Sequence, residues 1–326
     1  MSRLRAVPGG QSAPQPARAG SMVKVRVEAP GKVNLFLSAG APGADGYHLL
    51  TTVFQAVRLI ETVTARRQAA DLRGTITLGL EEPDPAVPTD ATNLAVRAAA
   101  RLAEETGVTD GVDLLLRKRV PVAGGMAGGS ADAAATLVAC NALWGTGLSQ
   151  AQLLVLAAQL GADVPFPLLG ATAVGHGRGD RLTPLMARGT YHWVFATSAQ
   201  GLSTPAVFQR FDALAQDSAA PAAPADVPAE LTGALRDGDP RALAACLHND
   251  LQEAAISLRP QLADIIALAE ASGALRAMVS GSGPTIAALA PDPATAMRVA
   301  NALTASGLVT GALRADAPVA GARMVG

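Results

Sequence analysis

Cysteine is scarce in this chain of 326 residues, which contains only Cys140 and Cys246. The two cysteines lie far apart in the sequence, so they offer no disulfide framework of the kind that stabilises small secreted domains. We therefore predict a reduced, cytoplasmic protein. At this length the chain exceeds one typical hydrophobic core, so two domains are expected.

Long basic runs and long apolar runs are missing as well. The formal net charge is -1, which argues against nucleic acid or an anionic membrane as a partner. No uncharged apolar stretch is long enough to cross a bilayer. The first residues are rich in Pro, Gly, Ala and Ser and lack the apolar segment of a signal peptide, so we interpret residues 1–21 as a disordered tail.

Two common nucleotide-binding signatures are also absent. No Gly-x4-Gly-Lys-Ser/Thr loop occurs, because Ser130 follows Gly129 directly. No Gly-x-Gly-x-x-Gly occurs either, so a Rossmann dinucleotide site lacks its fingerprint. A Rossmann dehydrogenase is therefore disfavoured.

A glycine cluster is the most informative feature that is present. Residues 120–132 read Val-Pro-Val-Ala-Gly-Gly-Met-Ala-Gly-Gly-Ser-Ala-Asp and join a predicted strand over 112–120 to a predicted helix over 133–144. Ser130 is the predicted helix N-cap. Free amides and the positive end of the helix dipole would then converge, which favours a phosphate. The alternative is a tight turn whose glycines serve only packing.

The predicted role of these glycines is conformational. Without a Cβ, each permits close approach of the backbone to an anion and a positive φ. The glycines concerned are Gly124, Gly125, Gly128 and Gly129.

Lysine is rare, since nearly all basic residues are arginine and the only lysines are Lys24, Lys32 and Lys118. Each lysine is therefore a candidate for a specific role. Lys32 and Asn34 share one face of a predicted strand over 32–38, which Pro30-Gly31 separates from a strand over 23–29. On that face they either converge on a ligand or form an exposed strand edge.

Two other local patterns also have two interpretations. Tyr47 and His48 follow a glycine turn, where they either stack on a planar ring or pack in an ordinary way. Asp163 lies between the end of a predicted helix and Pro165. It is either a cap or turn residue, or a carboxylate held at the mouth of a site.

Three separated stretches match one family pattern in order. Residues 30–35 read Pro-Gly-Lys-Val-Asn-Leu, residues 121–134 read Pro-Val-Ala-Gly-Gly-Met-Ala-Gly-Gly-Ser-Ala-Asp-Ala-Ala, and residues 280–284 read Ser-Gly-Ser-Gly-Pro. They resemble the three motifs of the GHMP kinases, a superfamily named for galactokinase, homoserine, mevalonate and phosphomevalonate kinases. The resemblance spans about residues 23 to 323.

This resemblance implies an α+β, two-domain GHMP-kinase fold. An N-terminal, ribosomal-protein-S5-like ATP-binding domain is expected over 22–186. A C-terminal, ferredoxin-like α/β sandwich domain is expected over 187–326.

Two further stretches narrow the implied activity. Residues 45–48 read Asp-Gly-Tyr-His and residues 160–165 read Leu-Gly-Ala-Asp-Val-Pro. They resemble the branch that uses ATP to phosphorylate the 2-hydroxyl of 4-(cytidine 5′-diphospho)-2-C-methyl-D-erythritol, in the non-mevalonate isoprenoid pathway. The alternatives are another small-molecule GHMP kinase, of homoserine or mevalonate type, and a catalytically silent nucleotide-binding protein.

The resemblance also implies roles for matching residues. Lys32 and Asp163 match the catalytic pair. The implied substrate contacts are Asn34, Tyr47, His48, Thr204 and Phe208, with Tyr47 and Phe208 sandwiching the cytosine. The implied ATP site comprises Asn93 together with Pro121, Val122, Ala123, Gly124, Gly125, Met126, Ala127, Gly128, Gly129, Ser130 and Ala131.

The implied cofactors are ATP and Mg²⁺, and no protein metal cage is expected, because Mg²⁺ readily keeps its waters. The expected partner is a small-molecule substrate that carries a cytidine diphosphate group. The protein itself is expected to be a monomer or a homodimer. The loop departs from the family pattern at Met126, Ala127 and Ala131, where a leucine, a third glycine and a second serine are common. The missing second hydroxyl removes a side-chain contact to phosphate or metal.

Overall fold

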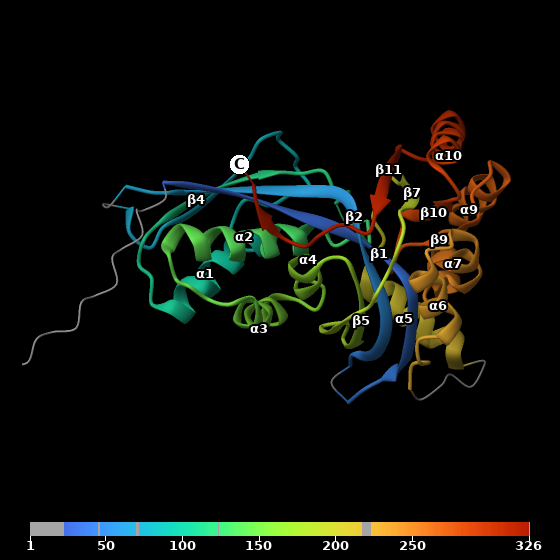
Figure 1. Cartoon of the computed structure of the whole chain (residues 1–326), viewed down its shortest axis with the longest axis horizontal. Coiled ribbons are helices and arrows are strands. Elements are labelled where there is room, and N and C mark those ends of the chain that lie inside the picture. Colours follow the sequence, from blue (N-terminus) through green and yellow to red (C-terminus); the bar gives the residue numbers. More distant parts are fainter. Residues whose placement is uncertain (1–22, 45, 70–71, 123, 217–222, 326) are drawn as a thin grey trace, which may run out of the picture.

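The computed structural model describes residues 23–44, 46–69, 72–122, 124–216 and 223–325. They form two sheets with helices packed against both (Figure 1). The predicted α+β class is confirmed. The predicted tail at 1–21 lies outside the described residues.

The first sheet has the strand order β12-β1-β2-β4-β3, with β5 and β6 attached through β2, and β8 through β1. Its strands are β1 (Lys24–Pro42), β2 (His48–Arg67), β3 (Ile76–Leu80), β4 (Val112–Arg117), β5 (Thr172–Gly177), β6 (Arg181–Pro184), β8 (His248–Asn249) and β12 (Arg323–Met324).

The first strand is continuous, so the predicted separation at Pro30-Gly31 is wrong. The pairing register between β1 and β2 shifts there instead, from Pro30–Ile60 to Gly31–Val57. Proline donates no backbone hydrogen bond and is tolerated in a sheet at such a bulge. A second shift falls between Asn34 and Phe36.

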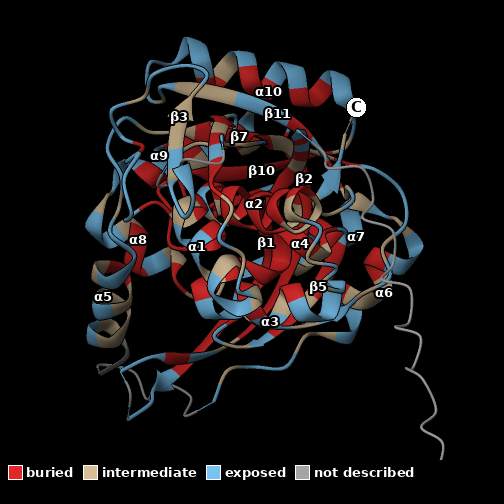
Figure 2. Cartoon of the chain, turned by 90° about the vertical axis from the view of Figure 1, so that its left-hand side faces the viewer, coloured by how far each residue is buried: buried red, intermediate tan, exposed pale blue. Residues whose placement is uncertain are grey.

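Four helices cover one face of this sheet (Figure 1): α1 (Leu94–Thr106), α2 (Gly128–Trp144), α3 (Gln150–Leu160) and α4 (Pro165–Leu169). Figure 2 shows α2 in the interior of the molecule, with most of its residues buried. Because alanines dominate this helix, it can pack closely against α1 and the sheet. The helix α1 ends at Gly107, which lies in the left-handed region that glycine adopts without strain.

The predicted N-cap of α2 is wrong. The helix begins at Gly128, and its N-cap is Ala127, which makes no side-chain capping hydrogen bond. Ser130 therefore lies inside the first turn. The glycine-rich segment can enter the helix early because neither Gly128 nor Gly129 has a side chain that must be accommodated.

The second sheet has the strand order β11-β7-β10-β9. Its strands are β7 (Tyr191–Thr197), β9 (Arg276–Val279), β10 (Ile286–Ala290) and β11 (Gly311–Ala317). The helices that follow β7 in the chain are α5 (Thr204–Gln216), α6 (Ala229–Asp237), α7 (Pro240–Cys246), α8 (Gln252–Leu258), α9 (Gln261–Ala271) and α10 (Pro293–Ala305).

The two sheets share a hydrophobic core. Val33 and Leu35 of β1 belong to the same buried cluster as Trp193 and Phe195 of β7. The strands β8 and β12, although late in the sequence, both pair with β1. The long β1–β2 pair therefore connects the two halves of the molecule, and a domain boundary at 186/187 remains a prediction.

Within the described ranges, every helix is too short or too polar to span a membrane.

Candidate active site

The three motif stretches meet at one point. The backbone N–H of Lys32 donates to the Met126 carbonyl at 3.1 Å. The Ser280 hydroxyl donates to the Gly125 carbonyl at 3.3 Å. A Cβ at Gly281 would lie 3.3 Å from Lys32 Nζ. Segments separated by about 250 residues of sequence therefore form one structure around Lys32.

Lys32 is only 4% exposed, so the interpretation of an exposed strand edge is wrong. Its Nζ donates to Asn34 Oδ1 at 2.6 Å and lies 4.0 Å from Asp163 Oδ2. Burial lowers the pKa of Lys32, and the negative charge of Asp163 opposes that shift. The structure thus brings the predicted catalytic pair together.

Asp163 occupies the turn between α3 and α4, and its side chain is 40% exposed. Pro165 begins α4 at a position where the missing N–H is tolerated. The short helix and the preceding glycine fix where the carboxylate lies. A partly exposed carboxylate beside a buried ammonium is accessible to a substrate from solvent.

The glycine loop forms one wall of a cavity of about 350 Å³, a size typical of small-molecule sites. The predicted ATP residues that line this cavity are Asn93, Pro121, Val122, Gly124, Gly125, Ala127, Gly128, Gly129 and Ser130. The first amides of α2 have no intrahelical partner there, and the helix dipole is positive at this end. This wall is therefore suited to an anion.

Backbone conformation in the loop differs from the prediction. Of its four glycines, Gly125 has a positive φ, at 72°. Ala127 also lies in the left-handed region, at φ 60°, which is strained for a residue with a Cβ. The close approach at Gly125 is to protein, because a Cβ there would lie 2.1 Å from the Ser280 carbonyl oxygen.

The other predicted loop residues lie elsewhere. Met126 is buried in the core that contains Val33 and Trp193. Ala131 is buried in the core beneath α2. Ala123, like Asp45 of the Asp-Gly-Tyr-His stretch, lies outside the described residues. Asn93 caps α1 by accepting from the Ala95 amide, and its own amide donates to the Pro88 carbonyl.

A buried charge cluster beneath the loop was not predicted. Lys118 Nζ lies 2.7 Å from Glu61 Oε1 and 2.5 Å from Asp132 Oδ2. Glu61 also accepts from the backbone amides of Arg119 and Val120. The rarity of lysine was the one sequence signal for this cluster, because it singled out Lys118.

Protonation in this cluster is shifted by burial. Burial raises the pKa of Glu61 to about 7, a shift that Asp132 reinforces and Lys118 opposes. Burial likewise raises the pKa of Asp132. Burial disfavours the charge on Lys118, but the two carboxylates hold its pKa above the ordinary value. Asp132 Oδ1 is buried and has no hydrogen-bond partner in the part of the chain that the structure describes, and Asp132 lines the cavity.

Of the predicted substrate residues, Asn34 lies on β1 beside Lys32, whereas Tyr47 and His48 lie at the start of β2 and Thr204 and Phe208 on α5. His48 stacks on Phe208, with ring centroids 4.7 Å apart, and its Nε2 lies 2.8 Å from Asp212 Oδ1. Thr204, Phe208 and Asp212 recur every four residues, so they share one face of α5. Thr204 Oγ1 lies 2.7 Å from Ser282 Oγ in the third motif. Sequence reasoning missed Asp212 and Ser282, although the four-residue spacing from Thr204 and Phe208 was a usable signal for Asp212.

Tyr47 is 56% exposed. The Arg178 guanidinium carbon lies 3.7 Å from the centroid of the Tyr47 ring. An aromatic ring in this position presents a large surface to a ligand from solvent.

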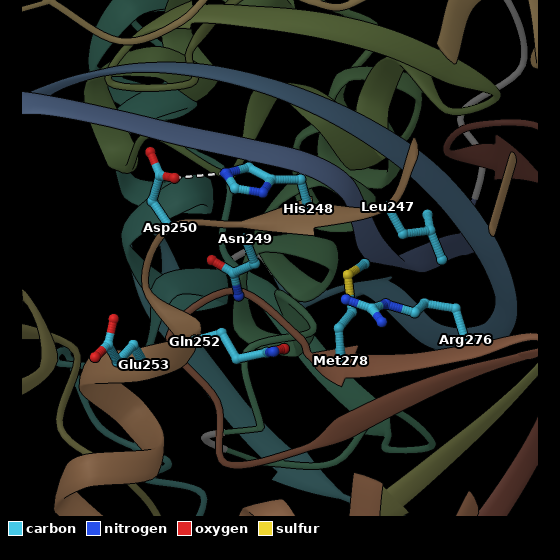
Figure 3. A pocket seen from close by; sticks show the side chains of 8 residues that line it. All are labelled: Leu247, His248, Asn249, Asp250, Gln252, Glu253, Arg276 and Met278. Carbon is cyan, nitrogen blue, oxygen red and sulfur yellow. Dashed lines mark hydrogen bonds and ion pairs between the residues drawn. The ribbon is translucent and has the colours of Figure 1, made fainter. Parts of the chain in front are cut away.

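A second hollow, of about 290 Å³, lies between β8, the start of α8 and β9 (Figure 3). Several of its polar groups are engaged within the protein. His248 and Asp250 face one another, at 2.5 Å, and Asp250 also accepts from Ser38 and Ala39. Asn249 donates to two backbone carbonyls. Among the described residues, none of the predicted site residues lines this hollow.

The fold and this convergence of three motifs define a GHMP kinase. Residues 93–171 match the family described as GHMP kinases N terminal domain, and residues 231–308 match GHMP kinases C terminal. A solved homoserine kinase from Cytophaga hutchinsonii shares the fold, with a TM-score of 0.73 at 21% identity over 94% of this chain and 99% of that one.

Closer relatives define the branch. The chain is 51% identical to a 4-diphosphocytidyl-2-C-methyl-D-erythritol kinase from Leifsonia xyli, over 93% of this chain and 99% of the relative. A crystal structure of 4-(cytidine 5′-diphospho)-2C-methyl-D-erythritol kinase matches with a TM-score of 0.72 at 32% identity, over 90% of this chain and 99% of that one. The chain therefore belongs to the 4-diphosphocytidyl-2-C-methyl-D-erythritol kinase family.

The contact between the two glycine loops can be tested by a pair of substitutions. Gly125→Ala places a Cβ against the Ser280 carbonyl, whereas Gly145→Ala introduces a Cβ into open space at a similar φ of 66°. We expect Gly145→Ala to lower the free energy of unfolding by about 1 kcal/mol, the cost of the left-handed conformation. Gly125→Ala should cost about 2 kcal/mol more, because backbone must move. Equal losses in urea unfolding would contradict this contact.

The shifted pKa of Glu61 predicts a pH effect on stability. Between about pH 4.5 and about pH 7 the folded chain binds more protons at Glu61 than the unfolded chain, so this contribution to stability falls as pH rises. Glutamine cannot ionise. The unfolding free energy of Glu61→Gln, relative to wild type, should therefore rise by about 1–3 kcal/mol from about pH 5 to about pH 8.

Urea unfolding at the two pH values measures this difference. The control is Glu104→Gln, whose side chain is 77% exposed and which should show a constant difference. A constant difference for Glu61→Gln would refute the shift.

Proposed function

We propose that this chain transfers the γ-phosphoryl group of ATP to the 2-hydroxyl of 4-(cytidine 5′-diphospho)-2-C-methyl-D-erythritol. The observation that carries the proposal is the position of the Lys32 and Asp163 pair beside the glycine loop, in a chain of this family. Lys32 is joined to that loop through the hydrogen bond from its backbone to Met126. The setting is a cytoplasmic enzyme that acts as a monomer or homodimer.

In the proposed mechanism, Asp163 orients the acceptor hydroxyl and accepts its proton. The acceptor is a tertiary alcohol, a weak acid and a crowded nucleophile, so orientation matters. Phosphoryl transfer depends mainly on positioning and on neutralisation of charge. Lys32 contributes a buried positive charge to the transferring oxygens, in surroundings where water screens it little.

The cavity at the glycine loop suits the phosphates of ATP, which we place there. Its wall includes the first turn of α2, whose amides have no intrahelical partner, together with Ser130 and Asp132. Within the described residues, no group of three or more His, Cys, Asp or Glu side chains forms a metal cage. Mg²⁺ ordinarily binds through phosphates, water and at most one or two carboxylates. When bound, Mg²⁺ neutralises negative charge on the phosphates.

We propose that Tyr47, His48 and Phe208 recognise the cytidine end of the substrate, with Asn34 and Thr204 contacting the remainder. His48 is held in place by Phe208 on one side and by Asp212 at Nε2. Base stacking on an aromatic ring contributes about 1–3 kcal/mol per base. That energy favours a nucleotide-tagged substrate over an untagged polyol phosphate.

Replacement of the proposed base tests the mechanism. We expect Asp163→Asn to keep the fold and to bind both ligands, but to lose about 10²- to 10⁴-fold in kcat, the usual contribution of a positioned general base. A coupled assay with the cytidylylated substrate and ATP measures turnover, and phosphorus NMR locates the new phosphate. Asp264→Asn, an exposed change on α9, is the control. Near-normal turnover of Asp163→Asn would remove Asp163 as the base.

Competition by cytidine diphosphate separates this activity from that of a homoserine or mevalonate kinase. We expect cytidine diphosphate to compete with the substrate, and Tyr47→Ala to weaken that inhibition by about 5- to 150-fold, from the loss of one stacking contact. The KM for ATP should not change. Leu49→Ala removes a neighbouring side chain that is 55% exposed and is the matched control. Equal inhibition of both variants would exclude a cytosine contact at Tyr47.

A further inference from the structure

Behind the Lys32 and Asn34 pair lies a third polar side chain, that of Thr52 on β2, which is 1% exposed. Its hydroxyl donates to the Phe36 carbonyl at 2.8 Å. The amide nitrogen of Asn34 donates to the same hydroxyl oxygen at 2.8 Å. The chain of contacts therefore runs from the Phe36 backbone through Thr52 and Asn34 to Lys32.

The direction of these hydrogen bonds follows from the number of protons that the Thr52 hydroxyl can donate. A threonine hydroxyl has one proton, and here that proton is committed to a backbone carbonyl. Toward Asn34 the hydroxyl can therefore only accept. This requirement turns the NH₂ group of Asn34 toward Thr52 and its oxygen toward Lys32, which has only donors to offer.

The rotamer of Thr52 is held by packing. A Cβ added at Gly175 would lie 3.1 Å from Thr52 Cγ2, so the threonine methyl group lies close to the backbone of β5. On the other strand, the register shift between Asn34 and Phe36 leaves Leu35 unpaired. Such bulges redirect side chains near functional sites. The packing of Thr52 and the bulge at Leu35 together place the Phe36 carbonyl and the Asn34 amide at the same hydroxyl.

We propose that Thr52 is a positioning residue for phosphoryl transfer, which sets the orientation of the Asn34 amide and thereby holds the Lys32 ammonium at the reacting phosphoryl group. This inference rests on the proposed kinase reaction. Asp163 is the charged group that forms an ion pair with Lys32 among the described residues. Asn34 supplies the shorter contact, so control of its oxygen decides where the ammonium lies.

Two substitutions separate the hydroxyl from the methyl group. Thr52→Val keeps the branched shape and loses the hydroxyl, whereas Thr52→Ser keeps the hydroxyl and loses the methyl. We expect Thr52→Val to lower kcat by about 10- to 100-fold, by analogy with hydrogen-bond partners that orient metal-binding side chains. Thr52→Ser should retain turnover within about threefold, although it loses packing against β5.

The control is Thr64→Val, on the same strand. Thr64 is 4% exposed, and its hydroxyl makes no side-chain hydrogen bond in the described part of the chain. It should keep wild-type kcat. The KM for ATP should stay within about threefold in all variants, because the cavity wall is untouched. If Thr52→Val keeps normal turnover, or if Thr52→Ser is as impaired as Thr52→Val, the proposal is wrong.

A second readout does not depend on turnover. Because the chain has only three lysines, ¹³C,¹⁵N-labelled lysine gives three sets of side-chain signals, and Lys32→Arg identifies that of Lys32. Loss of a fixed acceptor disfavours the ammonium form, so the pKa of Lys32 should fall by about one pH unit in Thr52→Val and stay at the wild-type value in Thr52→Ser. An unchanged Lys32 titration in Thr52→Val would overturn the proposal.

The two readouts also distinguish the two hypotheses. If the wild-type enzyme does not phosphorylate the cytidylylated substrate, the proposed function fails. The response of the Lys32 titration to Thr52→Val still decides whether the hydroxyl controls the ammonium. If wild-type turnover is normal and neither readout responds to Thr52→Val, the positioning role alone is refuted.

Discussion

The buried ammonium of Lys32 is the constraint on which the rest of the site depends. A charge removed from water needs hydrogen bonds and a counter-charge, or the folded state is penalised by several kcal/mol. The partners come from separate parts of the chain: Asn34 from the same strand and Asp163 from the turn between α3 and α4. Gly281 approaches so closely that a side chain there would meet both Lys32 and Asn34. The charge is therefore compensated by groups of the first sheet and its helices, and the third motif packs directly against it.

The charges of the two lysines near the glycine loop, Lys32 and Lys118, are compensated differently. Lys118 lies between two carboxylates, which hold its pKa above the ordinary value despite burial. Its charge is already neutralised within the protein. Lys32 has an amide oxygen as its close partner and a partly exposed carboxylate at 4.0 Å, and burial lowers its pKa. Its charge is incompletely compensated, which is the property needed by a group that must stabilise negative charge on a substrate.

The departures of the loop from its family's pattern also acquire a physical meaning. The Met126 side chain fills a core, as a leucine at that position would, so the substitution conserves apolar packing. The Ala131 side chain faces the core beneath α2, so the missing hydroxyl takes nothing from the cavity wall. Ala127 is the exception, since it adopts a left-handed conformation that a glycine would adopt without strain. Strained residues of this kind concentrate at functional sites.

Local residue patterns in the sequence predicted those secondary-structure elements that depend on neighbouring residues. The strand–turn–helix around the glycines follows from side-chain periodicity and from glycine. Motif order was enough to identify the superfamily and to select Lys32 and Asp163. Tertiary structure alone decided that Lys32 is buried, that Pro30 lies at a bulge within one long strand, and that Glu61 and Asp132 share Lys118. Burial and charge pairing depend on contacts between segments that are distant in the sequence, so local periodicity cannot predict them.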